Sequence, residues 1–147
     1  MNINYIKRLV NKLGFVPQNG TIGIYVKHYE KSNNYPIFID FNEQKIKYAH
    51  ESIKENERIR LGDLTTSNFS KLENFVVLEC VDRLLEKGYL SKNIELEKRY
   101  QLGRNLKGKL DIIVYDENGN IPFLMIECKT WGNEFEKEKR HLSCMTV

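Results

Sequence analysis

Two apolar runs that flank an Asn118-Gly119 pair constrain the fold of this chain more than any other feature. The runs cover residues 109–116 and 121–130. Asn-Gly between apolar runs is typical of a tight β-hairpin turn, because both residues tolerate a positive φ. We therefore predict two antiparallel strands joined at this turn.

Three charged residues interrupt the apolar strands of this hairpin: Asp111 in the first strand, and Glu127 and Lys129 in the second. Residues two apart in a strand point to the same face, so Glu127 and Lys129 should project together. Folding the hairpin about its turn brings Asp111 within about one residue of Glu127, given a strand rise of ~3.3 Å per residue. Charges inside a dry core are costly, so these groups need a partner or a function.

Two carboxylates beside an ammonium group have a chemical use. Carboxylates at close range repel each other, and a hard cation such as Mg²⁺ relieves the repulsion through oxygen ligands. A bound metal can activate a water and stabilise the charge that develops on a phosphodiester. We expect Mg²⁺ as the cofactor, with Mn²⁺ able to substitute, bound by Asp111 and Glu127 beside Lys129. The alternative is a simple salt bridge between Lys129 and a carboxylate at a sheet edge.

A helix is expected before the hairpin, over residues 71–87. Ser70 and Glu73 have the spacing of a capping box, with Ser70 as the N-cap. At 100° per residue the apolar side chains form one broad face that should pack on a sheet, whereas Asp82 falls on the polar face. A strand over residues 94–102 then leads into the hairpin.

The remaining elements complete an α+β (mixed α/β) fold, in which a helix precedes a three-strand antiparallel meander and a further helix that starts at residue 134. We place a domain boundary between an N-terminal helix and β-hairpin extension, residues 1–66, and a core of residues 67–147. Within the extension the patterns predict a helix followed by three strands. These elements cover residues 4–13, 21–27, 35–41 and 45–48.

The net charge of +3, from 23 basic and 20 acidic residues, is weak, but its distribution is informative. Basic residues cluster just before the predicted site, where a phosphate backbone would approach, and both DNA contact and a solvated strand edge fit them. They are Lys98, Arg99, Arg104, Lys107 and Lys109. No apolar run approaches the roughly 18 residues that span a bilayer, and the polar N-terminus is unlike a secretory signal. We therefore expect a soluble cytoplasmic protein with no membrane partner.

Lys109-Leu110-Asp111, followed by Glu127-Cys128-Lys129, resembles the signature of the PD-(D/E)XK nuclease superfamily. Residues 70–89 and 94–98 resemble the N-terminal endonuclease domain of type I-like restriction enzymes, closest to versions that precede an adenine-N6 DNA methyltransferase. The resemblance implies Asp111 and Glu127 as metal ligands, and Lys129 as the catalytic lysine. It also implies Glu73 as a carboxylate aimed at the metal, for which the capping box is the alternative. Glu95 and Glu97 are secondary candidates without an assigned role.

The function that this resemblance implies is a Mg²⁺-dependent DNA endonuclease of a restriction-modification system. DNA is then the substrate, methyltransferase and specificity subunits are expected partners, and a homo-oligomer is left open. Resembling enzymes continue past Glu-x-Lys with a longer helix and a further strand, whereas the pattern here ends near Glu138, so we expect a truncated core. Two alternatives stay open: a non-catalytic remnant that binds DNA or a partner, and a repair or junction-resolving nuclease of the same superfamily.

Overall fold

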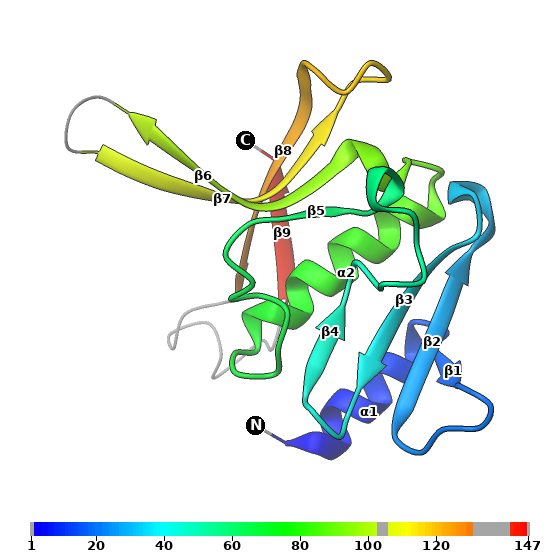
Figure 1. Ribbon diagram of the computed structural model, residues 1–147. Coiled ribbons are helices and arrows are strands. Elements are labelled where there is room, and N and C mark those ends of the chain that lie inside the picture. The colour runs from blue at the N-terminus through cyan, green and yellow to red at the C-terminus, as the bar shows by residue number, and fades with distance from the viewer. Residues whose placement is uncertain (1, 103–105, 131–141, 147) are drawn as a thin grey trace.

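The computed structural model describes residues 2–102, 106–130 and 142–146, which form two helices and two β-sheets (Figure 1). Most neighbouring strands are antiparallel, which confirms the predicted α+β class. Within these described residues, three short 3-10 helices lie in the connections. They are η1 (Glu30–Ser32), η2 (Glu55–Glu57) and η3 (Ser91–Asn93).

The N-terminal sheet has four antiparallel strands in the order β1-β2-β3-β4. Their bounds are Val16–Pro17, Ile24–Tyr29, Tyr35–Asp40 and Lys45–Lys47. Helix α1 (Ile3–Lys12) precedes the sheet and is capped by Asn2, whose side chain accepts a hydrogen bond from the Asn4 amide. The sequence predicted α1 and the three longer strands but not β1, which has only two residues.

The second sheet has five strands in the order β5-β6-β7-β8-β9. Their bounds are Arg60–Leu61, Ile94–Leu102, Leu106–Tyr115, Pro122–Thr130 and Leu142–Thr146. Strands β6, β7 and β8 form the predicted meander, and the β7–β8 connection turns at Gly119, where φ is +76°. Strand β5 runs parallel to β6, and β9 pairs antiparallel with β8. The sequence predicted neither of these two strands. The predicted final helix covers residues 134–142, of which 134–141 lie outside the described residues and Leu142 begins β9.

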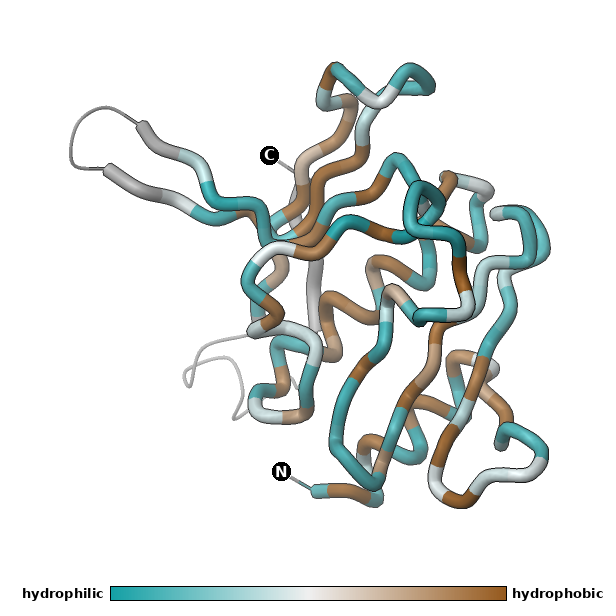
Figure 2. The backbone as a smooth tube through the Cα atoms, in the orientation of Figure 1, coloured by the Kyte–Doolittle hydropathy of each residue, from teal (hydrophilic) through white to brown (hydrophobic). Residues whose placement is uncertain are grey.

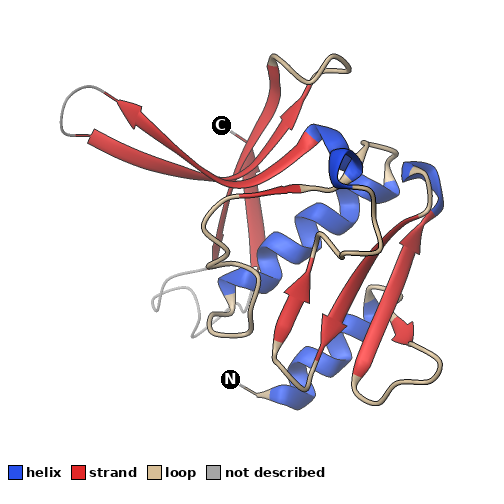
Figure 3. Cartoon of the chain, in the orientation of Figure 1, coloured by secondary structure: helices blue, strands red, loops and turns tan. Residues whose placement is uncertain are grey.

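Helix α2 (Glu73–Glu86) lies between the two sheets (Figure 3). Apolar side chains are buried around most of its circumference, since one side packs on β7, β8 and β9 and another faces the N-terminal sheet. The prediction that Asp82 lies on a solvated face is wrong. Its carboxylate is buried and accepts hydrogen bonds from Lys27 Nζ at 2.8 Å and Tyr29 Oη at 2.6 Å. A sequence pattern on one helix cannot reveal a partner that lies 55 residues away.

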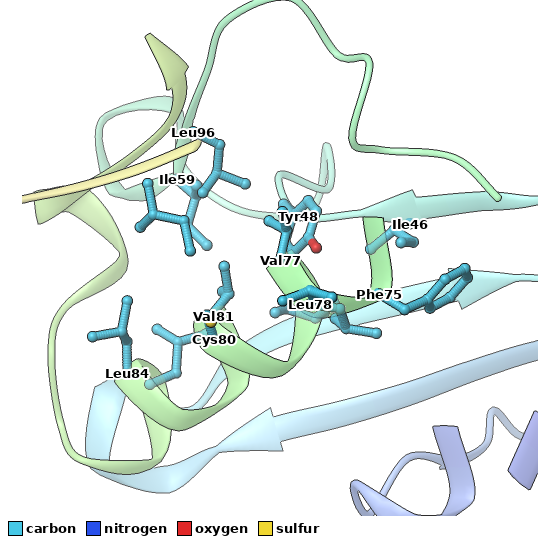
Figure 4. Close-up of a cluster of buried hydrophobic side chains, with 14 of the residues drawn as sticks. Ile46, Tyr48, Ile59, Phe75, Val77, Leu78, Cys80, Val81, Leu84 and Leu96 are labelled. Carbon is cyan, nitrogen blue, oxygen red and sulfur yellow. The ribbon is translucent and has the colours of Figure 1, made fainter. Parts of the chain in front are cut away.

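One cluster of buried apolar residues joins α1, α2 and both sheets (Figure 4). Leu78 and Val81 of α2 lie in it together with Ile46 of β4, Tyr48 directly after that strand, and Leu96 of β6. Figure 2 shows the hydrophobic stretches gathered along α2 and the strands beside it. The boundary near residue 66 stays a prediction, and the side chains on both sides of it share this core.

Replacing Asp82 with alanine should lower the free energy of unfolding by about 2–4 kcal/mol, because the partly buried Lys27 ammonium and the buried Tyr29 hydroxyl lose their shared acceptor. Urea denaturation followed by circular dichroism measures this change. The matched control is Arg83→Ala, since Arg83 is the exposed neighbour on the same helix and should change stability by no more than about 0.5 kcal/mol. Equal effects of the two substitutions would contradict the assignment of Asp82 as a buried link.

Candidate functional site

The predicted site lies where strands β7 and β8 stop pairing with each other. Their hydrogen-bonded ladder runs from Tyr115–Pro122 to Ile112–Ile126. Beyond that pair β7 stays paired with β6, whereas β8 stays paired with β9 (Figure 1). Asp111 and Glu127 are the next residues along the two strands, so both stand at the point of separation.

The Asp111 carboxylate fills part of this opening. Its Oδ2 accepts a hydrogen bond of 2.7 Å from the backbone amide of Cys128, which has no ladder partner on β7. Burial raises the pKa of Asp111, the Cys128 amide offsets part of that rise, and the negative charge of Glu127 adds to it. The carboxylate is therefore fixed in place in a position that disfavours its charge.

Glu127 and Lys129 lie on the same face of β8, as an ion pair of 3.5 Å between Lys129 Nζ and Glu127 Oε1 demonstrates. The alternate residues Ile126 and Cys128 are buried. The side chains of Lys129 and Glu127 are 56% and 40% exposed, so both groups can reach solvent or a substrate. This contact also satisfies the alternative prediction of a salt bridge at this position.

Glu73, the first residue of α2, is the third predicted carboxylate of the site. The predicted capping box is wrong: the N-cap is Leu72, which makes no side-chain cap, and the Ser70 hydroxyl instead contacts Asn68 Oδ1. Burial raises the pKa of Glu73, and the charge of Asp111 raises it further, whereas Lys129 opposes the rise. The Glu73 carboxyl therefore interacts electrostatically with Asp111 and Lys129 of the predicted site.

The donor set is suited to a hard cation. It consists of carboxylate oxygens, and two of the three carboxyl groups have raised pKa values that a nearby positive charge would lower. Among the residues that the structure describes, no three His, Cys, Asp or Glu side chains lie close enough together to hold a metal ion as they stand. Mg²⁺ needs only one or two carboxylates, with waters or phosphate oxygens completing its shell. Asp111 and Glu127 fit that smaller requirement.

Four of the five predicted DNA-binding residues lie on a projecting two-stranded ribbon, which we define as residues 98–102 of β6 paired with residues 106–110 of β7 (Figure 1). Three of these basic side chains have an acidic partner. Lys98 contacts Glu95 at 3.8 Å, Arg99 contacts Asp63 at 2.5 Å, and Lys109 contacts Glu97 at 3.3 Å. Of the other two, Arg104 lies outside the described residues, and Lys107 belongs to β7.

Glu97 was only a secondary candidate from the sequence, and the structure places it beside the predicted site. Its side chain is almost fully buried at 1% exposure, it contacts Lys109, and its charge acts on Asp111. No sequence signal marks this residue, because β6 alternates Glu95 and Glu97 as an exposed strand face would.

The sequence model of one protein family, the type I restriction enzyme R protein N terminus, matches residues 73–146, which is half of the chain. The chain belongs to this family. The match begins at Glu73 and includes Asp111, Glu127 and Lys129, so all four predicted site residues lie in the part that defines the R protein N terminus. Comparisons with curated proteins and with solved structures return no match. Among the described helices none is long and apolar enough to cross a membrane.

Replacing Asp111 with asparagine should raise the melting temperature by a few degrees at pH 7 in a buffer with EDTA. The raised pKa means that the folded state holds the Asp111 proton more tightly than the unfolded state does, so ionisation of Asp111 costs stability as the pH rises through that pKa. Asparagine removes the charge and can still accept the Cys128 hydrogen bond. The gain should vanish near pH 3, where the carboxyl is protonated in both states.

The control for this measurement is Asp116→Asn in the β7–β8 turn, where the carboxylate accepts bonds from the amides of Asn120 and Ile121. This variant should not gain stability. A melting temperature of Asp111→Asn at or below that of the wild type at pH 7 would show that the carboxylate is not electrostatically unfavourable.

Proposed function

We propose that this chain is a Mg²⁺-dependent DNA endonuclease domain of a restriction-modification system, with the PD-(D/E)XK arrangement of site residues. One observation carries the proposal: Asp111 and Glu127 stand on neighbouring strands at the end of the β7–β8 ladder, with Lys129 paired to Glu127. Membership of the R protein N-terminus family supports a role in restriction.

Asp111 and Glu127 are the proposed cation ligands, and Glu73 approaches from the start of α2. Mg²⁺ bound there would lower the pKa of a bound water and stabilise negative charge on the phosphate. The Asp111 carboxylate enters this role already oriented by the Cys128 amide, so little conformational freedom is lost on binding. Lys129 presents a half-exposed ammonium that can donate hydrogen bonds to the attacking water or to a phosphate oxygen.

DNA is the proposed substrate because of the ribbon that starts beside Asp111. Residues 98–110 contain five basic and no acidic residues. Of the strands that the structure describes, the two strands of the ribbon pair only with each other over residues 98–102 and 106–110. A two-stranded ribbon fits the major groove of duplex DNA, and lysine and arginine side chains contact its phosphates. The ion pairs of Lys98, Arg99 and Lys109 would then be exchanged for phosphate contacts.

A second candidate is a non-catalytic module that binds DNA or a partner subunit. The ion pair between Lys129 and Glu127 favours it, as does the lack of a three-ligand cluster in the described part of the chain. In that case the two charges would neutralise each other at a sheet edge, and no divalent cation would be bound.

Cleavage of supercoiled plasmid DNA in Mg²⁺ tests the proposal. Asp111→Ala and Glu127→Ala remove proposed ligands, and Lys129→Ala removes the proposed hydrogen-bond donor, so each should slow cleavage by at least about 100-fold. Glu117→Ala is the matched control, because this exposed acid lies in the turn at the opposite end of the same hairpin. Equal nicking by the wild type and all three site variants would refute the endonuclease assignment. A wild type that binds no Mg²⁺ or Mn²⁺ would favour the non-catalytic module.

A further inference from the structure

Strand β6 is distorted at Glu97, directly opposite Asp111. The register pairs Leu96 with Ile112 and Lys98 with Leu110, and it leaves Glu97 and Asp111 as the unpaired positions between them. Glu97 has a φ of +56°, which is an uncommon and strained conformation for a non-glycine residue. Such a conformation persists only where surrounding contacts hold it.

Those contacts converge on the Glu97 carboxylate. It accepts hydrogen bonds of 3.1 Å from the amides of Thr65 and Thr66, a shorter one from the Thr65 hydroxyl, and one of 3.3 Å from Lys109 Nζ. Burial alone would raise the pKa of Glu97, but these donors outweigh it and hold that pKa below its usual range. Glu97 is therefore a buried anion with a complete set of partners.

The donors belong to two segments that carry predicted site residues. Thr65 lies in the connection to α2, and its carbonyl accepts a hydrogen bond of 3.1 Å from Asn74 Nδ2, next to Glu73. Lys109 lies two residues before Asp111 on β7. The connection passes directly over the distorted strand, because a Cβ at Gly62 would lie 2.1 Å from the Glu97 carbonyl oxygen.

We propose that Glu97 is a positioning residue for the cation site, which rests on the function proposed above. Its carboxylate links the connection that leads to Glu73 with the strand that carries Asp111, and so fixes the spacing of the two acids. Glu97 acts through Thr65 and Lys109, which donate to its Oε1, while its Oε2 accepts from the Thr66 amide. The strained φ is the cost of aiming this carboxylate inward.

Calorimetric titration of the full chain with Mn²⁺, well below the melting temperature, tests this role. Glu97→Gln keeps the shape but removes the charge, and it should weaken Mn²⁺ binding by about 10–100-fold, the range for residues that orient metal ligands. The matched control is Glu95→Gln, which removes the same charge two residues earlier, where the acid contacts Lys98 and the Tyr115 hydroxyl. Its Kd for Mn²⁺ should stay within about 2-fold of the wild-type value.

A second variant covers the case in which Glu97→Gln does not fold. Thr65→Val removes the hydroxyl donor to Glu97 and should weaken Mn²⁺ binding by about 10-fold. The positioning role alone would be overturned if the wild type binds Mn²⁺ and Glu97→Gln binds it with unchanged affinity. If Glu97→Gln does not fold, unchanged affinity in Thr65→Val would overturn it in the same way. A wild type that binds no Mn²⁺ would overturn the proposed function and the positioning role together.

Discussion

The separation of β7 from β8 beyond the Ile112–Ile126 pair is the constraint on which the candidate site depends. Backbone amides inside a sheet need acceptors, and at this point the Cys128 amide donates to the side chain of Asp111, beyond the last residue pair of the β7–β8 ladder. This hydrogen bond holds the Asp111 carboxylate between β7 and β8. Glu127 and Lys129 project from β8 beside it, and both side chains are partly exposed.

Asp111 and Glu73 lie in surroundings that disfavour their ionised forms. Burial and repulsion between acids raise the pKa values of Asp111 and Glu73, whereas Glu97, opposite Asp111 in the β6–β7 register, has enough donors to hold its pKa below the usual range. Functional groups commonly retain such unfavourable electrostatics because a ligand relieves it. Helix α2 makes the arrangement possible, because its packing between two sheets provides the buried apolar support for Glu73.

The sequence predicted the elements whose signals are local. The Asn118-Gly119 turn, the shared face of Glu127 and Lys129, and the apolar helix before them all follow from short-range periodicity. Long-range features were missed: Asp82 is buried only because Lys27 and Tyr29 reach it from another sheet, and the distortion at Glu97 depends on a connection more than 30 residues earlier. The capping box failed because Ser70 pairs with Asn68, and β5 was too short to give a pattern.

The location of a bound cation tests the central claim most directly. Crystals of the protein grown with Mn²⁺ and measured for anomalous scattering should show a peak bounded by carboxylate oxygens of Asp111 and Glu127, at about 2.1–2.2 Å from each. Lys129 should then have moved from Glu127 toward solvent. Crystals that contain Mn²⁺ yet show no peak there, with the Lys129–Glu127 ion pair intact, would contradict the account and leave a charged sheet edge in place of a metal centre.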